Sequence, residues 1–150
     1  MNPSALANLL RIGQLKAEPR NEIEIRRLLS MARTRLSDAR LKNLSPEGRF
    51  TSAYNSAHAA ALAALRWYGY RSENRYVVFQ SLTHTLNWPA PRWRILDAAH
   101  HKRNLAEYEG FLEVEESSIE ELRSLASDLV ADVEKLVESE PLEKNSSKNS

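Results

Sequence analysis

The chain has 150 residues, with 21 lysines and arginines against 20 acidic residues, a formal net charge of +1 and no cysteine. This length suits a domain with a single hydrophobic core. The near-zero charge does not require a nucleic acid or a membrane as partner, and the lack of cysteine excludes disulfides and thiolate metal sites. No apolar run approaches the ~20 residues that span a bilayer, and the first residues lack the charge order of a signal peptide. We therefore expect a soluble, cytoplasmic protein.

The charges are unevenly distributed along the chain. Basic residues dominate the first third, namely Arg11, Lys16, Arg20, Arg26, Arg27, Arg33, Arg35, Arg40, Lys42 and Arg49. Acidic residues dominate a later segment, namely Glu107, Glu109, Glu113, Glu115, Glu116, Glu120 and Glu121. Two interpretations stay open: two solvated helix faces that attract each other, or a basic surface for a phosphate-bearing ligand.

Helical periodicity covers most of the chain, and strand signals are nearly absent. Residues 1–19 predict a short helix and a linker, with the helix beginning after the N-cap Ser4 and fading near Gly13. Pro19 opens a second helix that runs to about Asn43. The apolar stripe of this second helix consists of Ile25, Leu28, Leu29, Ala32, Leu36 and Ala39.

The most distinctive predicted helix covers residues 46–68. Ser45 is a typical N-cap, Pro46 suits the first helical position, and Gly69 suits the C-cap. Apolar side chains cover nearly all faces of this helix, and its many alanines favour helix formation and let neighbouring helices approach closely. We therefore expect it to be the most buried element.

Three further helices follow in the prediction. Residues 75–86 form a shorter helix, whose inward side chains are Tyr76, Phe79, Leu82 and Leu86. The next helix runs from about Pro91 to Tyr108. The last helix begins at Ser118, where Glu121 completes a capping box.

These elements predict the fold class and the organisation of the chain. The fold is an all-α, antiparallel helical bundle of about five main helices. The bundle covers residues 20–138, after the N-terminal segment 1–19. Residues 139–150 form a polar tail that we expect to be disordered.

The predicted helix before the last holds the only grouping of His, Arg, Asn and Tyr in the sequence. With about 100° of rotation per residue, the arc that faces the core holds Ile95, Ala98, Ala99, Leu105 and Ala106. Arg103 falls at the edge of this arc, beside a polar band with His100, His101 and Asn104. Two roles stay open for Arg103. It forms a surface ion pair with Glu107, or its guanidinium binds a phosphate together with Asn104 and a neighbouring histidine.

The ligand-binding residues that we predict on this helix are Arg103, Asn104, His100 and Tyr108. We expect His58 and His84 to lie in the core or at its boundary, with the hydrogen-bonding groups of their imidazoles satisfied. Asp97 and His101 are four residues apart, a spacing that favours a metal site only weakly. We therefore predict no metal and no cofactor.

The order of the predicted elements and two of their motifs point to a known superfamily. An alanine-rich helix reading RFTSAYNSAHAAALAALRWYGY follows a long helix, and a later helix ends in HHKRNLAEYEG. This arrangement resembles the HEPN superfamily of small all-α prokaryotic domains, over roughly residues 20–138. The pair Arg103-Asn104 followed by Glu107-Tyr108 is similar to the endings of several HEPN subfamilies.

The resemblance also implies what an active member should carry. Active HEPN ribonucleases have an Arg-x4–6-His pattern, usually starting Arg-Asn, and cleave RNA without a metal where the Arg and His of two subunits meet. Arg103 and Asn104 match the start, but Tyr108, Glu109 and Gly110 stand where the histidine belongs. Tyrosine, with a pKa of about 10, is a poor general base near neutral pH. This departure argues against RNA cleavage by the usual mechanism.

Three functions stay open. The first is a non-catalytic HEPN-like module that binds a nucleotide, RNA or a partner protein. For this module, the resemblance implies a toxin–antitoxin or defence system with a nucleotidyltransferase partner. The second is a metal-independent endoribonuclease that uses Arg103, Asn104 and a displaced histidine, His100 or His101. The third is a helical protein–protein interaction domain without a ligand.

We further expect a homodimer. The resemblance implies one, and three tryptophans and five tyrosines are more than one modest core needs. Interfaces favour such residues. Trp88 and Trp93 flank the proline-rich turn, so we predict them at the dimer contact.

Overall fold

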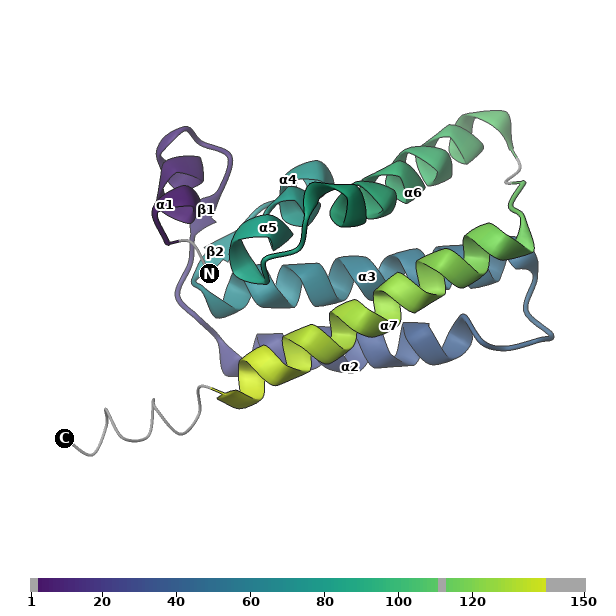
Figure 1. Ribbon diagram of the computed structural model, residues 1–150, viewed down its shortest axis with the longest axis horizontal. Coiled ribbons are helices and arrows are strands. Elements are labelled where there is room, and N and C mark those ends of the chain that lie inside the picture. Colours follow the sequence, from purple (N-terminus) through teal and green to yellow (C-terminus); the bar gives the residue numbers. More distant parts are fainter. Residues whose placement is uncertain (1–2, 111–112, 140–150) are drawn as a thin grey trace.

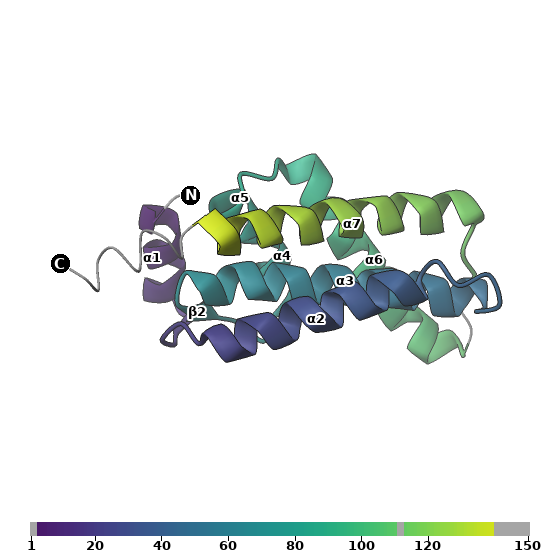
Figure 2. The ribbon, with the colours of Figure 1, turned by 90° about the horizontal axis from the view of Figure 1, so that it is seen from below.

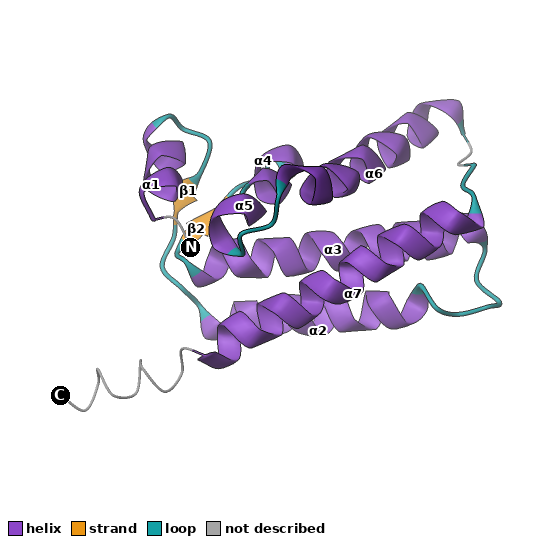
Figure 3. Ribbon diagram, in the orientation of Figure 1, coloured by secondary structure: helices purple, strands orange, loops and turns teal. Residues whose placement is uncertain are grey.

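The computed structural model describes residues 3–110 and 113–139, apart from the side chains of Pro3 and Glu107. The helices are α1 (Pro3–Arg11), α2 (Glu22–Asp38), α3 (Pro46–Trp67), α4 (Arg75–Gln80), α5 (Leu82–Thr85), α6 (Ala90–Glu109) and α7 (Glu116–Ser139). Two short strands, β1 (Lys16–Ala17) and β2 (Tyr70–Arg71), pair antiparallel. The all-α bundle that the sequence predicts is confirmed (Figure 3). The predicted disorder of residues 140–150 lies outside the described residues.

Helix α3 is the centre of the bundle. It packs against α2 and α7 along its length, and α4, α5 and α6 cover a further side (Figures 1 and 2). Alanines such as Ala53, Ala57, Ala60 and Ala64 are fully buried on it, and Ser56 donates to the Ala32 carbonyl oxygen of α2 at 2.6 Å. Small side chains let the neighbouring backbones approach closely, so the predicted burial of this helix is confirmed.

Side-chain caps set where the helices begin. Ser45 accepts from the backbone N–H of Gly48 at 3.0 Å, as expected for the start of α3. Helix α2 begins at Glu22 rather than at Pro19, because the Asn21 side chain caps it. The same helix ends at Asp38, earlier than the predicted Asn43. Helix α7 begins at Glu116, two residues before the predicted Ser118.

The predicted helix over residues 75–86 is divided into α4 and α5. The chain turns at Ser81, whose hydroxyl donates to the Val77 carbonyl oxygen at 2.7 Å. Phe79 and Leu82 are buried as expected. The inward prediction for Tyr76 is wrong, because its side chain is 41% exposed and only its ring edge packs, against Trp93.

Helix α6 departs from its predicted orientation. Leu96 and Ala99 are buried, but Leu105 is 56% exposed and Ala98 is also exposed. The helical wheel assumed packing along the whole helix, whereas α6 packs mainly against α4 and its later turns extend beyond α4 (Figure 1). The predicted core-facing arc is therefore wrong at Ala98 and Leu105.

Trp88 and Trp93 belong to the core and not to a dimer contact. They are 2% and 3% exposed. The Trp88 indole N–H donates to Asp132 at 2.9 Å, and that of Trp93 donates to the Thr83 hydroxyl at 2.9 Å. The aromatic residues that suggested an interface instead fasten the α5–α6 turn to the bundle, so this prediction is wrong.

Ion pairs join the basic and acidic segments of the chain. Arg49 binds Glu116 through both guanidinium nitrogens, at 2.9 and 2.6 Å, and Arg33 binds Glu134 at 2.8 Å. These contacts fit the first interpretation, in which two solvated helix faces attract each other. Among the described helices, none is both long enough and apolar enough to cross a bilayer.

Candidate functional site

A cluster of polar and aromatic side chains surrounds Tyr54, between α3, α4 and α6. Tyr54 is fully buried on α3, and its ring contacts the ring of His100 from α6, with centroids 5.9 Å apart and planes 18° apart. Phe79 of α4 packs edge-on against it at 5.9 Å. Three helices that are distant in sequence therefore meet at one phenol ring.

A hydrogen-bond chain runs outward from the Tyr54 hydroxyl. Arg75 donates to this hydroxyl at 3.0 Å, and Nδ1 of His100 lies 3.1 Å from it. Nε2 of the same imidazole lies 3.1 Å from the amide nitrogen of Asn104. When Asn104 donates to Nε2, the ring hydrogen resides on Nδ1. Tyr54 then accepts from two donors.

Two guanidinium groups flank the phenol. The Cζ atoms of Arg75 and Arg103 each lie 5.6 Å from the centroid of the Tyr54 ring. Neither guanidinium has an ion pair with a carboxylate among the described side chains. The predicted alternative, an Arg103–Glu107 ion pair, lies outside the described residues. The site thus holds two positive charges that these side chains do not pair.

His58 lies one helical turn after Tyr54 and completes the cluster. Its ring is parallel to the Tyr54 ring within 20°, at 6.5 Å, and it meets Phe79 edge-on at 5.9 Å. Burial is the largest cause that lowers the pKa of His58, to about 4, and the charges of Arg75, His100 and Arg103 add to it. His58 is therefore a neutral imidazole at neutral pH. Its side chain is half-buried, at the boundary of the core.

The other ionisable groups of the cluster respond to the same environment. Burial lowers the pKa of His100, and the positive charges of Arg75, His101 and Arg103 act in the same direction while Asp97 opposes them. Burial raises the pKa of the Tyr54 phenol, against the hydrogen bond and charge of Arg75. At neutral pH, the cluster therefore consists of neutral imidazoles, a protonated phenol and two guanidinium cations.

The structure brings together three of the predicted site residues. His100, Arg103 and Asn104 all belong to the cluster, and Arg103 is half-buried as the helical wheel predicts. Tyr108 does not join them, because its side chain is 92% exposed at the end of α6.

His101 lies apart from this cluster core. Its side chain is 70% exposed, and its Nε2 lies 3.4 Å from Oδ2 of Asp97. The other carboxylate oxygen of Asp97 is buried without a hydrogen-bond partner among the described residues. No group of three or more metal-ligating side chains occurs in the described ranges.

Sequence reasoning missed Tyr54, His58 and Arg75 as site residues. Tyr54 lies within the nearly continuous apolar surface of the residue 46–68 helix, and Arg75 carries no signal beyond its position at the start of α4. A usable signal was present in the spacing: Tyr54 and His58 are four residues apart on a helix that is otherwise almost entirely apolar. Two polar rings on one face of a central helix indicate a polar surface inside the bundle.

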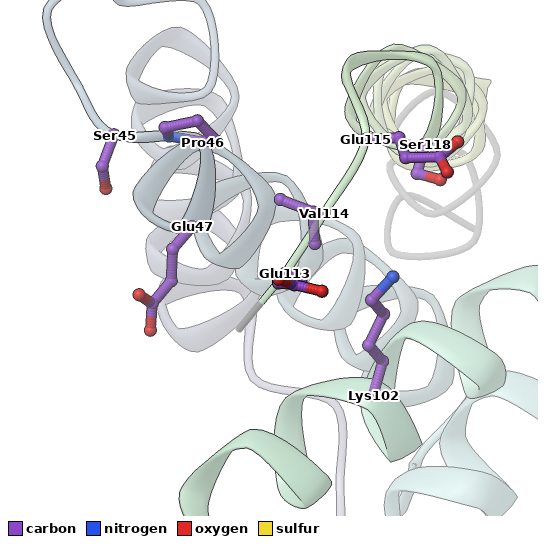
Figure 4. A pocket seen from close by; sticks show the side chains of 8 residues that line it. All are labelled: Ser45, Pro46, Glu47, Lys102, Glu113, Val114, Glu115 and Ser118. Carbon is purple, nitrogen blue, oxygen red and sulfur yellow. The ribbon is translucent and has the colours of Figure 1, made fainter. Parts of the chain in front are cut away.

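A large cavity elsewhere is unsuited to an anion. It measures about 830 Å³ and lies between the start of α3, the end of α6 and the start of α7 (Figure 4). Its charged lining comprises Glu47, Glu113 and Glu115 against a single Lys102. Three carboxylates around one ammonium repel a phosphate, so the Tyr54 cluster is the better candidate.

Comparison with protein-family models, with curated proteins and with solved structures finds no match for this chain.

Proposed function

We propose that this chain is a non-catalytic, HEPN-like module that binds a phosphate-bearing ligand, a nucleotide or RNA, at the Tyr54 cluster. The observation that carries the proposal is the pair of guanidinium groups, Arg75 and Arg103, placed at equal distances from one phenol ring without carboxylate partners among the described side chains. Guanidinium groups match the geometry of phosphate oxygens and can bind them in a bidentate way.

The neighbouring groups suit an anion as well. The Asn104 amide supplies a neutral donor, and the neutral imidazoles of His58 and His100 add no competing negative charge. Asp97 is the one carboxylate that acts on both Tyr54 and His100 in the described chain. Two cations against one carboxylate leave a net positive site.

A titration tests the proposal. Binding of a 5′-nucleotide or a short RNA, followed by calorimetry, should weaken about tenfold or more in Arg103→Ala and Arg75→Ala, because each change removes a charge-assisted contact. Arg26→Ala, on the exposed face of α2, is the matched control and should bind like the parent protein. Unchanged affinity in both site variants would remove this proposal.

The endoribonuclease stays the second candidate, since a neutral imidazole lies beside an arginine and an asparagine. His100 contacts Asn104 at 3.1 Å and lies in the field of Arg103, which would make it the displaced histidine. We expect no meaningful cleavage of mixed single-stranded and structured RNA. Cleavage that disappears both in Arg103→Ala and in a variant lacking His100 and His101 would favour the enzyme.

The proposed homodimer needs a different contact from the predicted one. Leu105 and Tyr108 are three residues apart on α6 and are 56% and 92% exposed, so they lie on one face of the helix end. An apolar and an aromatic side chain exposed together are typical of an interface. Light scattering of the parent protein and of a Leu105→Glu, Tyr108→Glu variant tests this contact: a monomer mass for the parent at all concentrations contradicts it.

A further inference from the structure

We infer that the Tyr54 cluster selects a terminal phosphate monoester over an internal phosphodiester. The inference rests on the proposed anion binding at Arg75 and Arg103 and names the ligand class more closely. A terminal phosphate has three unsubstituted oxygens and one attachment point, whereas a diester has two of each.

The number and the origin of the donors favour three free oxygens. Arg75 comes from α4, and Arg103 and Asn104 come from α6. Both guanidinium groups lie near the same phenol ring, so that donors from two helices are available beside it. A diester has one free oxygen fewer, so part of this donor set would have no acceptor. Its second ester substituent would also have to pass between the helices to reach solvent.

The depth of the cluster acts in the same direction. Tyr54 is fully buried, and Arg75, His58, His100 and Arg103 are all half-buried. An anion that binds both half-buried guanidinium groups is therefore partly enclosed between α4 and α6 and does not need to reach the buried Tyr54 hydroxyl. A terminal phosphate can enter end-on, with its ester substituent still in solvent, but a continuous backbone strand cannot.

The charge of the cluster also matches a dianion. The ionisable groups of the site are Tyr54 and His58 from α3, Arg75 from α4, and His100 and Arg103 from α6. Asp97 and His101 of α6 lie outside the cluster core and act on it through their charges. A phosphate monoester carries about −1.5 to −2 charges at pH 7, and a diester carries about −1. Burial first, and then the positive charges of the arginines, keep His100 neutral. The second negative charge of a monoester opposes the effect of the arginines, so monoester binding should take up part of a proton at His100.

Two matched ligand pairs test the selection on the full chain. The first is AMP against 3′,5′-cyclic AMP, which share base and sugar and differ in the phosphate. The second is one short RNA with and without a 5′-phosphate. We expect AMP to bind at least about tenfold more tightly than its cyclic form, and the 5′-phosphorylated RNA to bind more tightly than the 5′-hydroxyl RNA.

Variants and buffers locate the effect. Arg103→Lys keeps the positive charge but removes the two parallel N–H donors of the guanidinium. This variant should lose most of the preference for AMP over cyclic AMP. Arg26→Ala should keep it. Calorimetry of AMP in two buffers of different ionisation enthalpy should show proton uptake at pH 7, which should be absent in His100→Gln. Thermal melting establishes that each variant is folded.

The outcomes separate this inference from the proposed function. Equal binding of AMP and cyclic AMP, with both weakened in Arg103→Ala, overturns the monoester selection and leaves the anion site standing. No binding of either nucleotide at millimolar concentration overturns both. A preference for AMP that persists unchanged in Arg103→Lys and Arg75→Ala also overturns the inference, because the selection would then lie elsewhere.

Discussion

Two groups of arginines lie along α3, and their surroundings differ in one respect. Near the end of α3, Arg66 is 1% exposed and binds Glu24 at 2.6 Å, while Arg71 binds Glu18 at 2.9 Å and also pairs with Glu24. Around Tyr54, about 18 Å earlier on the same helix, Arg75 and Arg103 have no such partners among the described side chains. Arginines that are ion-paired with carboxylates stabilise the fold, whereas arginines without such partners remain able to bind a ligand.

The hydrogen bonds of the Arg66 group explain its structural role. Besides Glu24, the Arg66 guanidinium donates to the carbonyl oxygens of Pro19 at 2.7 Å and Glu18 at 2.9 Å. These contacts fasten the segment between β1 and α2 to the end of α3. Burial raises the pKa of Glu24, but its hydrogen bonds to Arg66 and Arg71 outweigh that effect and lower it, so the carboxylate stays ionised.

Arg66→Ala should give the largest effect in the molecule. Removing the buried guanidinium takes from Glu24 one of its two arginine partners and leaves two carbonyl oxygens without their donor, which costs about 3–5 kcal/mol of unfolding free energy. Urea denaturation measures it. Arg103→Ala is the matched comparison and should change the unfolding free energy by less than about 1 kcal/mol. Similar losses of unfolding free energy in Arg66→Ala and Arg103→Ala would mean that the two groups of arginines do not differ in structural role.

The pH dependence of stability should reveal the buried imidazole of the Tyr54 cluster. Burial lowers the pKa of His58 to about 4 in the folded chain, from its ordinary value of 6.5. Between these two pH values the unfolded chain binds more protons, so stability falls as the pH falls through this window. The loss between pH 7 and pH 5 should be about 2 kcal/mol from this group. His58→Leu should flatten the curve there. An unchanged slope in that variant would mean that His58 is solvated.

Arg103→Lys should separate binding from stability at the Tyr54 cluster. The lysine keeps the charge but cannot form two parallel hydrogen bonds, so nucleotide affinity should fall nearly as much as in Arg103→Ala, by about tenfold. The melting temperature should stay within a few degrees of the parent value. Calorimetry and thermal melting of the same samples decide it. Unfolding of either variant would make Arg103 a structural residue like Arg66.

The smallest expected effect belongs to the Tyr54 hydroxyl. Tyr54→Phe keeps the ring contacts with His100 and Phe79 but removes the oxygen between Arg75 and His100. We expect a stability loss of about 1 kcal/mol and a weaker affinity for the nucleotide. Denaturation and calorimetry measure the two effects. A stability loss as large as that of Arg66→Ala would show that this hydroxyl, too, is mainly structural.

The sequence predicted what depends on local geometry. The cap at Ser45, the left-handed Gly69 just after the C-cap Tyr68, and the apolar faces of α3 fixed that helix and its burial, because capping and periodicity act within a few residues. Likewise, Arg103 lies at the edge of the buried stripe with His100 and Asn104 nearby, since residues three and four apart on one helix are neighbours in any fold.

Only the tertiary structure decided what those residues face. Tyr54, His58 and Arg75 join the site because α3, α4 and α6 meet there, and no spacing within one helix reveals a contact between residues 54 and 100. The two tryptophans predicted at an interface became core residues for the same reason. Local sequence determines a helix and its faces, but the partner of each face depends on how all the helices share one core.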